Sequence, residues 1–297
     1  MNARQVVSGA LAAAMLAATG ASLEAQLPPN LRDYPLATFH KSGDLVAPFF
    51  DGFYDNGDGT VTFSFGFMNR NTEEIVDIPL GPNNFIEPAQ FNGMQPSHFP
   101  VYDRGGLIGK RERGSFAVTV PANMAGTEVV WTLTHAGRTY AVPGRTGTIA
   151  YDMSTGPAAF GSLPPAVRFT ADSPISTNRE GVVAERVTAR VGMPVTLSAL
   201  VQDRGECAPY AADLEGKMVF PVNATWILHQ GPAAVVFSIE TEKIESEGWG
   251  VATTQATFSE PGEYVIRLRA DNFGAPDSKF DNQCCWSNAY VPVTVTP

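Results

Sequence analysis

The segment of residues 256–271 constrains the fold more than any other part of the chain. An apolar run ends at Phe258, Pro261 and Gly262 provide a tight corner, and a second run begins at Tyr264. Alternate residues of the second run share one face: Tyr264, Ile266 and Leu268. This period of two is that of a β-strand. A Tyr just after such a corner can bury its ring and hydrogen-bond its hydroxyl to nearby backbone, so the segment predicts a β-sandwich.

The first 25 residues predict a secretory signal peptide. Arg4 supplies a positive charge, residues 6–18 are apolar, and Ala25 provides a small residue at a cleavage site before Gln26. The apolar run is too short to favour a transmembrane helix. We therefore expect a soluble, exported bacterial protein, periplasmic or extracellular, with no membrane span after signal cleavage.

Composition narrows the possible partners. The chain has 297 residues and a formal net charge of −10, so it lacks the positive surface that binds nucleic acid or anionic membranes. Only 17% of the residues are charged, while 28 Gly and 23 Pro provide many turns. This length and composition predict an all-β protein of two domains.

We assign the first domain to residues 26–153. Residues 55–59 predict a hairpin turn, because the strand that follows places Val61, Phe63, Phe65 and Phe67 on one face. Further strands are expected at 74–80, 114–120, 128–134 and 138–142. Residues 85–113 have no regular period, so they are expected to form either a binding surface or a cover over a sheet edge.

Part of this domain resembles a segment that recurs in uncharacterised exported bacterial proteins. The similar positions are residues 66–71, 81–84, 96–99 and 130–134. The resemblance covers about one hundred residues, the size of one domain. It implies a shared sandwich and brings no known activity with it.

Residues 154–165 contain several Pro and Gly and predict a semi-rigid linker. The second domain spans residues 166–297. Its expected strands are 167–171, 182–191, 195–202, 224–229, 235–239, 251–258, 264–270 and 289–295. We expect Pro292 to mark an exposed edge strand, because Pro cannot donate a ladder hydrogen bond.

This second domain resembles a PKD-type or bacterial immunoglobulin-like domain. The resemblance rests on residues 192–199, a strand containing Trp226, and the corner at residues 258–264 that leads to Asp271. Residues 226–231 depart from the Trp-x-Phe-Gly-Asp-Gly of the common PKD pattern. The resemblance implies a spacer, binding or assembly role more often than catalysis.

The three cysteines are Cys207, Cys284 and Cys285. In an immunoglobulin-like sandwich the loops that carry them gather at one end, and an oxidising compartment permits disulfides. We expect Cys207 to pair with Cys284 or Cys285; a bond between the two adjacent cysteines is the alternative. A redox or metal role is disfavoured because no Cys-x-x-Cys is present.

Three residues are candidates for ligand binding. Trp249 and Trp286 are expected in loops, where an exposed ring can stack on a sugar or anchor a partner, although local packing is the commoner role. His98 lies in the irregular segment, where a binding or active site is expected. Trp131 and Trp226 fall within strands and are expected in the cores.

No metal or other cofactor is predicted. Asp203, Asp271 and Asp281 are weak calcium candidates, because they are expected in loops at one end of the second domain, where solvated turn residues are more common. Residues 55–59 do not continue as a calcium-binding loop. The histidines of the first domain lack the spacing of zinc ligands.

The sequence contains none of the common motifs for hydrolases or phosphate binding. The leading hypothesis is an exported, non-catalytic binding or adhesion protein whose partner is an extracellular or periplasmic protein or glycan. The alternatives are a secreted hydrolase with its site in residues 85–113, and a structural subunit of a surface assembly. The ligand and the oligomeric state are not specified by the sequence.

Overall fold

A computed structural model describes residues 38–103, 110–153, 163–205, 222–245, 248–272 and 285–297. The predicted signal peptide and most of the predicted linker lie outside these residues. Residues 40–297 belong to one compact unit. The regular structure of the described residues is β-strand with three single-turn 3₁₀ helices. No helix among them is both long and apolar enough to span a membrane.

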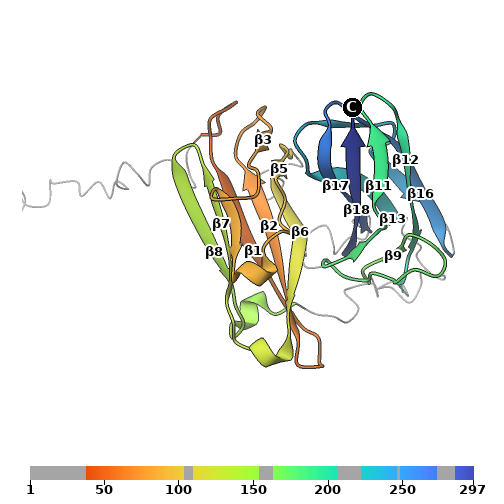
Figure 1. Cartoon of the computed structure of the whole chain (residues 1–297). Coiled ribbons are helices and arrows are strands. Elements are labelled where there is room, and N and C mark those ends of the chain that lie inside the picture. The colour runs from red at the N-terminus through yellow and green to blue at the C-terminus, as the bar shows by residue number, and fades with distance from the viewer. Residues whose placement is uncertain (1–37, 104–109, 154–162, 206–221, 246–247, 273–284) are drawn as a thin grey trace, which may run out of the picture. The chain divides into compact units, whose positions relative to one another are not determined.

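The chain forms two β-sandwiches in tandem, as the sequence predicts (Figure 1). In the first sandwich, one sheet has the order β1 (Val46–Asp55), β2 (Val61–Asn69), β6 (Arg111–Val120). The other has the order β4 (Asn84–Glu87), β7 (Val129–His135), β8 (Arg138–Gly144). A short pair of strands, β3 (Val76–Asp77) and β5 (His98–Phe99), lies outside these sheets.

The hairpin between β1 and β2 confirms the turn predicted at residues 55–59. The Asp55 carboxylate accepts a hydrogen bond from the Gly57 amide at 2.9 Å, and Asp58 accepts one from the Thr60 amide at 2.9 Å. These side chains satisfy the backbone of the turn, as Asp commonly does. The expected phenylalanine face of β2 packs into a core that includes Trp131, which is fully buried.

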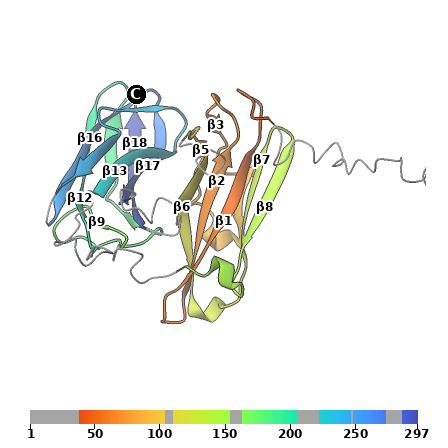
Figure 2. The same cartoon turned by 180° about the vertical axis from the view of Figure 1, so that it is seen from behind.

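The second sandwich consists of two larger sheets (Figure 2). One has the order β10 (Val182–Val183), β18 (Trp286–Thr296), β17 (Gly262–Asp271), β13 (Val222–Gln230), β15 (Thr241–Ile244), and β11 (Val187–Arg190) also pairs with β18. The other has the order β14 (Val235–Phe237), β16 (Gly250–Phe258), β12 (Val195–Gln202), β9 (Ala166–Arg168).

The tyrosine corner is present in this sandwich. The Tyr264 ring is buried and packs against Phe258 with ring centroids 4.8 Å apart. Its hydroxyl donates to the Glu260 carbonyl at 2.9 Å. Trp226 is fully buried in the core between the sheets. These contacts and the two-sheet arrangement make the second sandwich immunoglobulin-like.

Several expected strands differ in extent. The strand expected at 74–80 contributes only β3, and the one expected at 182–191 divides into β10 and β11. Three further strands are not expected from the sequence: β15, and β4 and β5, both of which overlap the segment expected to be irregular.

The expectation that Pro292 marks an edge strand is wrong. Its strand, β18, has β17 on one side and both β10 and β11 on the other. The pairing with β10 ends at Tyr290 and that with β11 begins at Val293. Pro292 therefore falls in the gap between two partners, where no ladder hydrogen bond is required of it.

Candidate functional site

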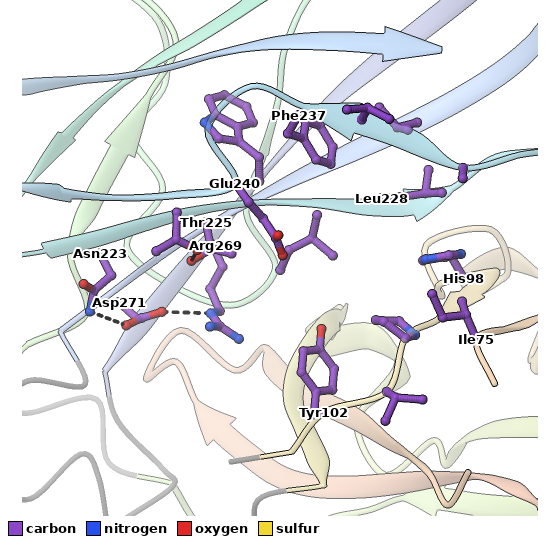
Figure 3. A pocket seen from close by; sticks show the side chains of 18 residues that line it. Ile75, His98, Tyr102, Asn223, Thr225, Leu228, Phe237, Glu240, Arg269 and Asp271 are labelled. Atoms are coloured by element: carbon purple, nitrogen blue, oxygen red, sulfur yellow. Dashed lines mark hydrogen bonds and ion pairs between the residues drawn. The ribbon is translucent and has the colours of Figure 1, made fainter. Parts of the chain in front are cut away.

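A cavity of about 750 Å³ is lined by residues of both sandwiches (Figure 3). The first sandwich contributes Ile75, His98 and residues 100–102. The second contributes side chains of β13, β14 and β17 and of the segment that joins β14 to β15. The segment that contains His98 was the expected location of a site, and the structure places it on one wall of this cavity.

His98 is oriented by a carboxylate on the neighbouring strand. It lies opposite Asp77 in the pair of β3 and β5, and its Nδ1 is 2.7 Å from an Asp77 oxygen. The side chain of His98 is only 14% exposed, whereas that of Asp77 is 53% exposed. In a neutral ring that donates from Nδ1, Nε2 is a hydrogen-bond acceptor.

A second wall of the cavity is apolar. It is formed by the strand β14 and the residue before it, with Val235, Val236 and Phe237 among the lining side chains. Val236 is 69% exposed, and Ile75, which the first sandwich contributes to the lining, is 54% exposed. Apolar side chains of this size are usually buried, so their exposure beside a cavity indicates a surface that an apolar ligand can cover.

Two polar groups point into the cavity. The Glu240 carboxylate and the Tyr102 hydroxyl extend toward it from different sandwiches (Figure 3). Among the described residues, no hydrogen-bond or ion-pair partner of the Glu240 carboxylate is present. Thr225 and Thr241 also line the cavity, and their hydroxyls bond to each other at 3.1 Å. Glu240 is therefore a polar group available to a ligand.

A buried ionic cluster braces the sandwiches beside the cavity. Glu112 of β6 is fully buried and accepts hydrogen bonds from Arg267 and Arg269 of β17. Arg269 also donates from Nε to Asp271 at 2.8 Å. Burial alone would lower the pKa of Arg269, but the carboxylates of Glu112 and Asp271 raise it above its ordinary value. Arg269 thus remains charged, with its charge compensated.

Hydrogen bonds from β13 hold the loop that precedes His98. Gln230 donates to the carbonyls of Gly93 and Gln95 at 2.8 and 2.7 Å. His229 Nε2 is 2.8 Å from the Met94 carbonyl. Burial, with a further contribution from Arg267, lowers the pKa of His229 to about 3, so the neutral ring donates to that carbonyl. The second sandwich thereby fixes the position of the loop of the first sandwich that leads to His98.

The two tryptophan candidates lie elsewhere. The half-buried ring of Trp249 packs under the Arg168 guanidinium, whose central carbon is 4.0 Å from the ring centroid. Trp286 begins β18 and is 1% exposed, with the Arg179 guanidinium 3.5 Å from its ring. The expectation of a loop position for Trp286 is wrong, and its buried ring has no open face for a ligand. Neither residue lines the cavity.

The structure describes two of the three calcium candidates, Asp203 and Asp271. Asp271 is the last residue of β17 and is buried against Arg269 and Asn223, which corrects its expected loop position. Asp203 accepts a local hydrogen bond from the Gly205 amide at 3.1 Å, and Asp281 lies outside the described residues. Within the described part of the chain, no three His, Cys, Asp or Glu side chains are grouped as metal ligands.

The cysteine pairing stays a prediction. Cys285 is fully buried. Cys207 and Cys284 lie outside the described residues, so neither expected pairing is tested.

Comparisons with known proteins do not identify a family. No family model and no curated protein matches the chain. Among solved structures, the D00-D0 domain of intimin is 12% identical with a TM-score of 0.27, and the match covers 84% of this chain and 100% of that chain. Domains 4 and 5 of the S-layer protein SbsC are 13% identical with a TM-score of 0.22, covering 86% and 98%. The titin Ig tandem A164-A165 is 12% identical with a TM-score of 0.22, covering 85% and 99%. Such low TM-scores carry no argument about fold or function.

Proposed function

We propose that this chain is an exported, non-catalytic binding protein that holds its ligand in the cavity between the two sandwiches. The observation that carries the proposal is the cavity itself. Its volume of about 750 Å³ lies within the range of ligand sites, and apolar walls with a few convergent polar groups are typical of such sites. The PKD-like resemblance of the second domain agrees with a binding role outside the cytoplasm.

The bracing around the cavity supports this proposal. Glu112, Arg267 and Arg269 join β6 to β17, while Gln230 and His229 hold the loop before His98. A site whose walls are fixed before the ligand arrives loses less conformational entropy on binding. The ligand would be a protein segment or glycan of the periplasm or the cell exterior.

Filling the cavity provides a test of this proposal. Ala234 is exposed and lines the cavity, so Ala234→Trp should occupy part of it without disturbing either core. We expect ligands found on glycan and peptide arrays to bind this variant at least about tenfold more weakly. A loss of about 1.4 kcal/mol of binding free energy is sufficient for a tenfold weaker affinity. Isothermal titration calorimetry measures the change.

Ala125→Trp is the matched control, because Ala125 is exposed in the first sandwich and does not line the cavity. It should bind the same ligands as the unmodified protein does. Equal affinity of the two variants would contradict the assignment of binding to the cavity.

One observation favours a hydrolase as a second candidate. The Asp77–His98 contact of 2.7 Å resembles the orientation of a general base by a carboxylate. If the protein is a hydrolase, purified protein should cleave ester, peptide or glycoside substrates, and His98→Asn should lower the rate about 10²- to 10⁴-fold. A fluorogenic substrate panel measures this rate. Absence of turnover by the unmodified protein would eliminate this candidate and favour simple binding.

A further inference from the structure

We propose that the ligand of the cavity carries an organic cation, an ammonium group attached to an apolar body. This inference rests on the proposed binding function and names the chemical class of its ligand. Its basis is the charge that the cavity presents, together with the residues that surround that charge.

One charge has no ion-pair partner among the described residues that line the cavity. Of its charged lining residues, Arg269 and Asp271 form an ion pair with 2.8 Å between Arg269 Nε and the Asp271 carboxylate. Arg269 also binds the buried Glu112. Glu240 is the remaining carboxylate of the lining, and no ion pair within the described residues neutralises it. A ligand of positive charge therefore complements this site, whereas a carboxylate ligand would be repelled.

The surroundings of Glu240 favour an organic cation over a metal ion. Calcium takes six to eight oxygen ligands, and the described residues contain no group of three His, Cys, Asp or Glu side chains that could begin such a set. An ammonium group needs one carboxylate and a few acceptors. The Tyr102 hydroxyl points into the cavity, and His98 Nε2 becomes an acceptor when Nδ1–H bonds to Asp77.

The apolar wall matches the rest of such a ligand. Val235, Val236 and Ile75 offer aliphatic surface beside the carboxylate. Phe237 and Tyr102 add aromatic rings, whose faces attract cations. A lysine side chain of a peptide and a free alkylamine share this chemistry, and both fit within about 750 Å³.

The test compares ligands that differ only in charge. The probes are hexylamine, 1-hexanol and hexanoate, together with the capped peptides acetyl-Leu-Lys-Leu-amide and acetyl-Leu-Gln-Leu-amide. Calorimetric titration of the intact protein should show each ammonium probe binding about three- to tenfold more tightly than its neutral counterpart. Hexanoate should bind most weakly. The preference for ammonium should shrink as salt is added, because ions screen the partly exposed Glu240.

Glu240→Gln should remove the preference for ammonium, so that hexylamine and 1-hexanol bind with similar affinity. Glu185→Gln is the matched control, since Glu185 is exposed and does not line the cavity. It should retain the preference. Tighter binding of the lysine peptide than of hexylamine would identify a peptide source, and the reverse order would identify a free amine; either result supports the inference.

The failure of this inference is distinguishable from that of the proposed function. If charged and neutral probes bind equally and Ala234→Trp blocks both, the ligand is not a cation but the cavity is still the binding site. If Ala234→Trp does not weaken the binding of hexylamine, both the cationic ligand and the assignment of binding to the cavity are overturned. No measurable binding of either ammonium probe would also overturn the inference.

Discussion

Glu112→Gln is expected to lower the free energy of unfolding by about 3–5 kcal/mol, the usual cost of removing one partner from a buried ion pair. Glu112 is fully buried, and its carboxylate accepts hydrogen bonds from Arg267 and Arg269. The amide is similar in size but carries no charge. It therefore leaves one of the two buried guanidinium charges without compensation, because Asp271 still pairs with Arg269. Denaturant-induced unfolding followed by intrinsic fluorescence measures the loss.

Glu128→Gln provides the control for this substitution. Glu128 lies 3.8 Å from Arg145, and the two side chains are 52% and 65% exposed. Such surface pairs typically contribute less than about 1 kcal/mol. If Glu112→Gln has no larger effect than this control, the cluster does not stabilise the contact between the sandwiches.

The strands were predictable because their signals are local. The alternation at Val61, Phe63 and Phe65 and the corner before Tyr264 each lie within a few consecutive residues. The structure confirms both, since the three side chains pack in the first core and Tyr264 closes its corner. The short strand β15 gives no such signal, because its four residues, 241–244, do not alternate between polar and apolar side chains.

The cavity was not predictable from such patterns. His98 and Tyr102 approach residues of β13 and β14 that follow them by more than one hundred positions. No periodicity specifies how two sandwiches dock. The sequence favours His98 only because its segment lacks a regular period, and no pattern distinguishes Glu240 from other acidic residues.

One signal in β17 could have indicated the contact between the sandwiches. Arg267, Arg269 and Asp271 alternate on the face opposite Tyr264. Opposite charges repeated on one face of a strand can pair with one another or with an approaching partner. The alternation alone does not specify which of these occurs; in the structure, Glu112 of β6 contacts both Arg267 and Arg269 on this face.

Gly114→Ala is expected to destabilise the protein by about 2–5 kcal/mol through two separable effects. Gly114 has a φ of +54°, and an L-residue in that region costs about 1–2 kcal/mol. Its new Cβ would also lie 2.3 Å from Trp286 Nε1 and 2.7 Å from Arg179 Cδ. Overpacking of this kind typically costs a further 1–3 kcal/mol, roughly. Thermal and denaturant unfolding measure the sum.

Gly126→Ala separates the two effects. Gly126 has a φ of +85°, but no atom lies within 4 Å of the position its Cβ would occupy. It should therefore show the backbone cost alone, about 1–2 kcal/mol. Equal losses in the two variants would contradict close packing at Gly114. Because Gly114 belongs to β6 and Trp286 to β18, any excess loss at Gly114 measures how tightly the first sandwich packs against the second. The walls of the cavity depend on that same packing.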